Sequence, residues 1–130
     1  MNKLTIFLIL GFFVLTSSAE AQEILLNCKW DRGKVGKRIL IKEDDLAKDI
    51  VIGLNIPQKR ITKSFYGGEI KIISWSENQV TWSAKSEPLK VDINYSLSRI
   101  SGSLEIVFYD HEDKITIKNY YKCDKTQKKF

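Results

Sequence analysis

The chain has a single histidine, His111, and this scarcity limits the chemistry that it can carry. A histidine-based metal cluster needs more than one imidazole, and the Ser101-Gly102-Ser103 turn lacks the G-x-S-x-G pattern of a hydrolase nucleophile. The acidic run Asp110 to Asp113 lacks the alternation and the glycine of an EF-hand loop, so we interpret it as a solvated hairpin tip. The sequence therefore predicts no cofactor, no metal and no enzymatic activity.

Long apolar runs are also scarce. The one such run, Leu4 to Leu15, follows a positively charged start and precedes the sequence Ala19-Glu20-Ala21. This arrangement is typical of a signal peptide cleaved before Gln22, and about a dozen apolar residues are too few for a membrane span of about 20. We expect residues 1–21 to be a signal peptide and residues 22–130 to form a single monomeric domain without a transmembrane segment. Such a protein would be periplasmic or secreted.

Acidic residues are outnumbered, with 16 Asp and Glu against 21 Lys and Arg, which gives a formal net charge of +5. The excess is moderate and spread along the chain. It favours anionic neighbours such as lipid headgroups, acidic polysaccharide or acidic proteins. Nucleic acid is not an expected partner, because no stacking motif of the RNP type is present.

Cysteines number two, and in an exported chain a pair is most simply a disulfide. Cys28 has the same alternation phase as Ile24 and Leu26, and Cys123 has the phase of Ile117 and Tyr121. Both thiols should therefore point to the apolar side of their strands. We expect a Cys28–Cys123 bridge that makes the first and last strands neighbours.

Helical patterns are nearly absent. The stretch Lys42 to Asp49 favours a helix, at one or two turns, and is too short to organise a core. Strand patterns separated by short turns occupy Ile24 to Trp30, Arg38 to Ile41 and then Ile50 to Cys123, with a polar connection over 31–37. They predict an all-β fold, a single antiparallel up-and-down sheet curled into a small lipocalin-like barrel or half-barrel. A two-sheet sandwich is the alternative.

The alternating segment Val91 to Tyr109 predicts a β-hairpin around Ser101-Gly102. If these two residues are the whole loop, the facing pairs are Arg99 with Leu104, Leu97 with Ile106, and Tyr95 with Phe108. Alternation then puts the large apolar side chains on one face. Upstream, the turn 56–59 pairs Leu54 with Ile61 and Ile50 with Phe65.

The alternation between Ile70 and Trp75 has a fault. A turn at Gly67-Gly68 predicts that Ile70 and Ile72 face the core, whereas a turn at Glu77-Asn78 pairs Trp75 with Val80 and puts Ile73 and Trp75 there. A β-bulge at about Ile72-Ile73 reconciles the two, because one extra residue changes the phase. The competing explanation is a strand buried on both faces, with Asp44 to Asp49 lying over the outer one.

Four motifs carry a resemblance to known proteins. The order I-x-W-S-x-N-x-V-x-W from Ile73, Y-S-L-S-R-I-S-G-S-L from Tyr95, then Y-x-C and a closing K-K-F resembles a group of small exported bacterial β-domain proteins. In that group a strand ending Arg-x-x-Gly-x-Leu precedes the final cysteine. The resemblance implies a β-fold and export and supplies no activity. A weaker likeness to periplasmic lysozyme inhibitors implies inhibition of a hydrolase such as lysozyme.

Three sets of residues are candidates for function. Arg99 falls beside apolar residues, so it should cap the end of the barrel, form an ion pair or clamp an anionic ligand. Aromatic side chains could fill the core or line a ligand cavity: Trp30, Trp75, Trp82, Tyr95 and Phe108. Lysines make the last strand and tail basic, either as a solvated edge or as a contact with an anionic surface: Lys114, Lys118, Lys122, Lys125, Lys128 and Lys129.

The expected function is therefore non-catalytic. The chain should be an exported β-domain that binds an envelope protein or an anionic surface. A small carrier of an apolar ligand and a periplasmic hydrolase inhibitor are the alternatives.

Overall fold

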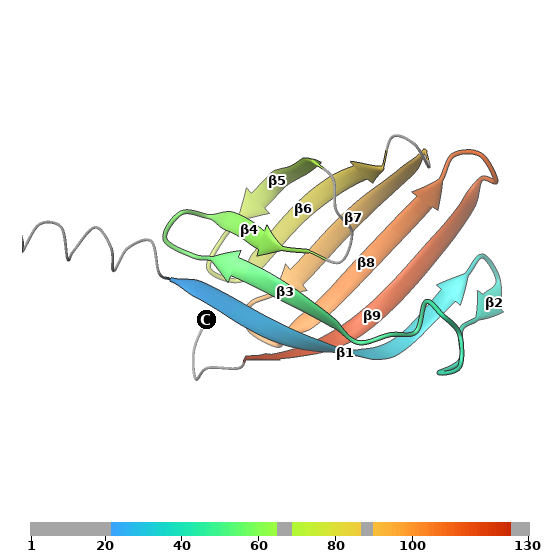
Figure 1. Ribbon diagram of the computed structural model, residues 1–130, viewed down its shortest axis with the longest axis horizontal. Coiled ribbons are helices and arrows are strands. Elements are labelled where there is room, and N and C mark those ends of the chain that lie inside the picture. The colour runs from blue at the N-terminus through green and yellow to red at the C-terminus, as the bar shows by residue number, and fades with distance from the viewer. Residues whose placement is uncertain (1–21, 65–68, 87–89, 126–130) are drawn as a thin grey trace, which may run out of the picture.

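The computed structural model describes residues 22–64, 69–86 and 90–125, and these form nine β-strands (Figure 1). Their bounds are β1 Glu23–Val35, β2 Arg38–Ile39, β3 Ile50–Asn55, β4 Arg60–Lys63, β5 Glu69–Trp75, β6 Gln79–Ser86, β7 Val91–Ser98, β8 Ser103–Asp110 and β9 Ile115–Lys125. None of these residues is helical, so no helix among them could cross a membrane. The predicted signal peptide, 1–21, lies outside the described residues.

The strands form one antiparallel sheet in the order β4-β3-β1-β9-β8-β7-β6-β5, and β2 pairs with β1 beside this path. The sheet curls until its two edge strands, β4 and β5, approach each other as an unsealed seam (Figure 1). This confirms the predicted curled up-and-down sheet, and the two-sheet sandwich is not formed. The turn expected at Gly67-Gly68 predicts that β4 pairs with β5, and this prediction is wrong because the two strands are the opposite edges of the sheet. Their turn at Gly67-Gly68 and the Ile50–Phe65 pair lie outside the described residues.

Within the sheet β1 pairs with β9, and the predicted Cys28–Cys123 disulfide joins these two strands. The two cysteines are direct cross-strand partners, so the bridge connects strands that are already hydrogen-bonded neighbours. β1 is longer than predicted, because the polar segment 31–35 continues the strand after a bulge between Trp30 and Arg32.

Gly33 explains why the polar second half of β1 can stay in the sheet. A Cβ atom there would collide with the Asn119 side chain and would lie 2.9 Å from both Leu40 Cδ1 and the Lys118 carbonyl. The missing side chain lets Asn119, which is buried, accept a hydrogen bond from Trp30 Nε1 at 3.0 Å. The glycine that suggested a loop therefore makes room for a close strand contact.

The helix-favouring stretch forms turns instead of a helix. The Asp44 N–H donates to the Ile41 carbonyl and the Ala47 N–H donates to the Asp44 carbonyl, and each N···O distance is 3.0 Å. Neither bond is continued into a helix. The Asp44 carboxylate accepts the Ile41 N–H at 2.7 Å and pairs with Arg38 at 3.3 Å. These interactions fix the segment as a connection between β2 and β3.

The β7–β8 hairpin keeps its predicted faces but not its predicted pairs. Leu97 faces Leu104, Tyr95 faces Ile106 and Ile93 faces Phe108, two residues away from the expected register. The loop has four residues, Arg99 to Gly102, and is closed by a 3.0 Å bond from the Gly102 N–H to the Ser98 carbonyl. Gly102 has a φ of 78°, which suits glycine. A shift of two residues preserves alternation, so hydrophobicity could not detect it.

The predicted bulge in β5 is confirmed. The register breaks between Ile72, which faces Trp82, and Ser74, which faces Thr81, while Trp75 faces Val80 as expected. Ile73 is the extra residue and is 59% exposed, so its predicted place on the core face is wrong. Ile70, Ile72 and Trp75 all pack against the core, which removes the need for a covering segment. Leu54 faces Ile61 as predicted.

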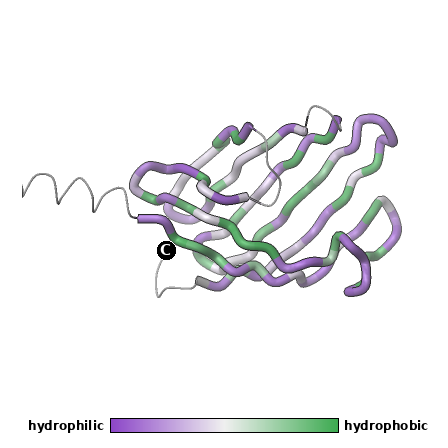
Figure 2. The backbone as a smooth tube through the Cα atoms, viewed as in Figure 1, coloured by the Kyte–Doolittle hydropathy of each residue, from purple (hydrophilic) through white to green (hydrophobic). Residues whose placement is uncertain are grey.

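The barrel interior is filled by alternate residues along the strands. Hydrophobic and hydrophilic segments alternate along the strands in Figure 2. Trp82 and Tyr95 are buried at its centre and stack with ring centroids 4.8 Å apart. Leu26, Ile52 and Ile106 are fully buried in the same core cluster. Alternation sends the neighbouring residues to the outer face, where most polar side chains lie.

Candidate anion-binding face

The outer face of β1 and β9 carries a cluster of cations that we call the basic patch, formed by Lys29, Arg32, Lys34, Lys118 and Lys122. All five side chains are exposed. Lys118 and Lys122 come from the predicted lysine set. Of the rest of that set, Lys114 lies in the turn before β9, and Lys128 and Lys129 lie outside the described residues. Lys125 ends β9, and its side chain is not described.

β9 is an inner strand between β1 and β8, so its lysines do not guard a sheet edge as one interpretation supposed. Protection against strand addition is needed where backbone groups are unpaired, and β9 is paired on both sides. Those lysines therefore need another explanation.

The three cations of β1 were not predicted. The bulge at Asp31 shifts the phase, so that Lys29 and Arg32 share a face although they are three residues apart. The signal available in the sequence was the run of basic residues on both sides of Gly33. It was interpreted as part of a polar loop because the strand was expected to end at Trp30.

Within the basic patch, lysines face lysines. Lys29 is the cross-strand partner of Lys122, and Lys34 is the partner of Lys118. Like charges directly opposite each other in a sheet are unfavourable, typically by a few tenths of a kcal/mol or more. A bound anion would remove this repulsion, which makes the arrangement suited to an anionic partner.

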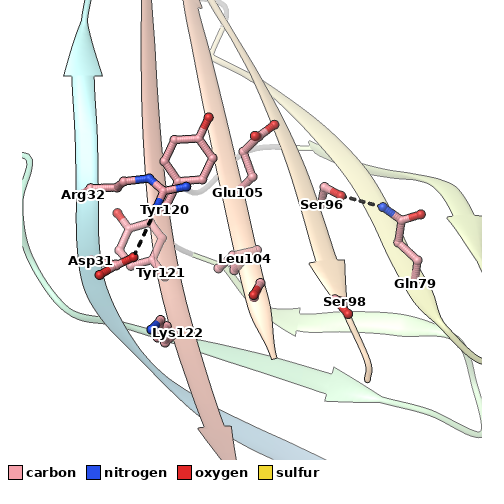
Figure 3. Close-up of a pocket in the computed structure, with 11 residues that line it drawn as sticks. Asp31, Arg32, Gln79, Ser96, Ser98, Leu104, Glu105, Tyr120, Tyr121 and Lys122 are labelled. Carbon is pink, nitrogen blue, oxygen red and sulfur yellow. Dashed lines mark hydrogen bonds and ion pairs between the residues drawn. The ribbon is translucent and has the colours of Figure 1, made fainter. Parts of the chain in front are cut away.

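Between the two lysine pairs, Arg32 lies over the ring of Tyr120, with Cζ 4.6 Å from the ring centroid (Figure 3). Asp31 pairs weakly with the same guanidinium at 3.8 Å, and both side chains are well exposed. Exposed pairs of this kind contribute little, so Arg32 stays available to an anion. The stacking holds the guanidinium plane in place.

A shallow groove of about 420 Å³ extends from Arg32 and Tyr120 across the outer face of β8, β7 and β6 (Figure 3). Beyond Glu105 its lining is mainly neutral and hydroxylated, with Ser96 accepting a 2.7 Å hydrogen bond from Gln79 Nε2. The positive charge is therefore concentrated at the β1–β9 side of this face.

Arg99 lies at the end of the barrel, separate from the basic patch. Its Nη1 donates to the Ser76 carbonyl at 2.7 Å, and its backbone N–H donates to the Asn78 carbonyl at 2.8 Å. These bonds tie the β7–β8 loop to the β5–β6 turn. The predicted position beside Leu104 is wrong, because the register differs by two residues.

The candidate aromatic residues belong to the hydrophobic core or pack against it. Trp82, Tyr95 and Phe108 are buried in the core, and Trp30 and Trp75 pack against it half-buried. The apolar hollow beside Phe108, near Leu46, measures about 120 Å³. Sites for small apolar ligands are usually about 300–1,000 Å³.

His111 lies at the β8–β9 turn, where Nε2 is 2.7 Å from Asp92 Oδ2. Asp110 accepts the backbone N–H groups of Glu112 and Asp113 through Oδ1, which fixes the turn. Among residues 22–64, 69–86 and 90–125, no group of three or more His, Cys, Asp or Glu side chains could hold a metal ion.

The chain matches no family model, no curated protein and no solved structure. The two resemblances drawn from sequence motifs therefore stay predictions.

Proposed function

We propose that this protein is an exported, non-catalytic β-domain that binds an anionic surface of the cell envelope through the basic patch. The observation that carries the proposal is the pair of cross-strand lysine contacts, Lys29 with Lys122 and Lys34 with Lys118. This arrangement disfavours the free protein and favours a state in which anions lie between the lysines. The disulfide fits an oxidising compartment outside the cytoplasm.

The carrier function has less support. The aromatic residues expected to line a cavity are packed in the core, and the apolar hollow beside Phe108 has less than half the volume that such ligands usually occupy. No feature of the described residues specifically favours a hydrolase inhibitor.

The test is binding of the mature protein to phosphatidylglycerol vesicles and to uncharged phosphatidylcholine vesicles over a range of salt concentrations. Wild-type protein should bind the anionic vesicles and dissociate as salt rises to roughly 0.5 M, because exposed charges are then screened. Anionic binding that does not respond to salt, or no binding at all to any anionic surface, would contradict the proposal.

A matched pair of variants separates the basic patch from net charge. Lys118→Gln/Lys122→Gln should weaken vesicle binding about 25-fold, since each surface cation contributes about 1 kcal/mol. Lys63→Gln/Lys71→Gln removes the same two charges from exposed positions on β4 and β5 and should have a much smaller effect. Equal losses in the two variants would show that the patch has no special role.

A further inference from the structure

Beside the basic patch, two isoleucines are unusually exposed. Ile39 is 68% exposed and Ile41 is 58% exposed, and they are two residues apart in the segment that forms β2 and the chain just after it. Single exposed apolar residues are common on protein surfaces and need no explanation. Two neighbouring ones next to cations form a candidate contact with another apolar phase.

The isoleucines are continuous with the basic patch. Ile39 is the cross-strand partner of Lys34, which in turn faces Lys118, so the three side chains form one row on the outer face. Lys37 and Lys42, both exposed, flank the isoleucines along the chain. Acidic residues follow Lys42 at positions 43–45. An apolar pair with a lysine on each side along the chain can bury its isoleucines at the lipid boundary while the flexible lysine side chains reach the phosphates.

The local structure keeps the isoleucines outward. Leu40, between them, is buried against Gly33 and donates its N–H to the Gly33 carbonyl at 2.9 Å. Asp44 accepts the Ile41 N–H at 2.7 Å. Leu40 is thus fixed inward, while the residues on either side of it, Ile39 and Ile41, are exposed.

We infer that the β1–β2 hairpin, Lys34 to Ile41, is a membrane anchor that inserts Ile39 and Ile41 into the surface of an anionic lipid bilayer. This inference rests on the proposed function and names its partner. A second copy of the chain is a poor occupant, because it would bring two basic patches together. A hydrated acidic polysaccharide would satisfy the lysines but would gain little from the isoleucines, whereas a bilayer uses both.

The experiment compares two double variants against two ligands. Ile39→Ser/Ile41→Ser removes the anchor, and Ile73→Ser/Ile100→Ser is the control, since those residues are 59% and 77% exposed on β5 and in the β7–β8 loop. The anchor variant should bind phosphatidylglycerol vesicles about tenfold more weakly than wild type. Its binding to dextran sulfate, a soluble polyanion, should be unchanged, and the control should match wild type with both ligands.

Insertion itself can be followed by fluorescence. Tryptophan in the variant Ile39→Trp should shift its emission to shorter wavelength with phosphatidylglycerol vesicles and be quenched by brominated lipid, and Ile100→Trp should show neither change. Vesicle binding by the anchor variant equal to that of wild type would overturn the inference. So would wild-type binding to dextran sulfate without binding to vesicles, which would leave the proposed function standing with a polysaccharide partner. Failure of the wild type to bind either ligand would contradict the proposed function itself.

Discussion

Reduction of the Cys28–Cys123 bridge should lower the thermal stability of the protein strongly. The bridge closes a loop with a sequence separation of 95 residues. For a loop of this length, the chain-entropy model gives about 4.7 kcal/mol at 25 °C. A domain of about 100 residues loses roughly 4 °C in Tm for each kcal/mol, so the full effect would be about 20 °C. We expect a decrease of about 10–20 °C, because residual structure in the unfolded chain reduces the entropic term.

The assay is differential scanning calorimetry of the oxidised protein with and without dithiothreitol. The double variant Cys28→Ser/Cys123→Ser is the control and should melt near the reduced protein, with no response to the reductant. The reduced protein should still fold, because β1 and β9 retain their backbone pairing on both sides of the bridge. A decrease below about 3 °C would refute the entropic reasoning, and two free thiols in the exported protein, found by mass spectrometry, would refute the bridge.

Three further substitutions test other parts of the structure. Gly33→Ala should destabilise the fold by about 1–3 kcal/mol in urea denaturation, because the new Cβ collides with Asn119; an unchanged midpoint would contradict the close contact. Lys118→Gln should instead raise the free energy of unfolding by a few tenths of a kcal/mol, since it removes the repulsion with Lys34; a loss would show that the lysines do not repel. The Ile41 N–H bond, opposed by desolvation and aided by Arg38, lowers the pKa of Asp44 below 3.8. The hydrogen bond between the Asp44 carboxylate and the Ile41 N–H should therefore stabilise the protein above pH 3.8, and this stabilisation should disappear as the pH falls through the lowered pKa of Asp44. NMR titration of the Ile41 amide measures the loss of the hydrogen bond, and Asp44→Asn should abolish the pH dependence of the amide signal.

Alternation predicted the faces of residues correctly in regular strands, but it gave the wrong face for Ile73, which is the extra residue of the β5 bulge. The phases of Cys28 and Cys123 predicted both the bridge and the neighbouring terminal strands. The conflict between Ile72 and Trp75 predicted a bulge, because hairpins on both sides required the same core face. These inferences use only the period of two, which the core imposes on every strand.

Register and pairing partners were harder to predict. The β7–β8 hairpin differs from its predicted register by two residues, a shift that leaves the apolar face intact. Gly33 suggested a loop, although its role is to admit Asn119. Whether the edge strands β4 and β5 pair depends on how far the whole sheet curls, and the residues of a local turn do not determine that curl.

The candidate site was only partly predictable, because alternation gives the face of a residue in a regular strand but does not give the position of a bulge. Lys118 and Lys122 share a face by simple alternation and were visible in the sequence. Arg32 was hidden, because the bulge at Asp31 changes its phase. The sequence predicts an ordinary strand over Arg38 to Ile41 and gives no sign that its isoleucines are exposed. Ile39 is exposed because β2 is a two-residue strand that pairs only with β1.

The unusual position of the chain ends within the sheet has a consequence for folding. In spatial order, β5 to β9 form one continuous meander, and β1, β3 and β4 form the other half of the sheet with β2 beside β1; the two halves meet at β9 and β1. Each half can form by local pairing, whereas the β9–β1 pairing must close nearly the whole chain and raises the contact order. We expect docking of the two halves to limit the folding rate. A circular permutant with linked native ends and new ends between β4 and β5 would make every pairing local, and it should fold faster than the native chain when both are reduced.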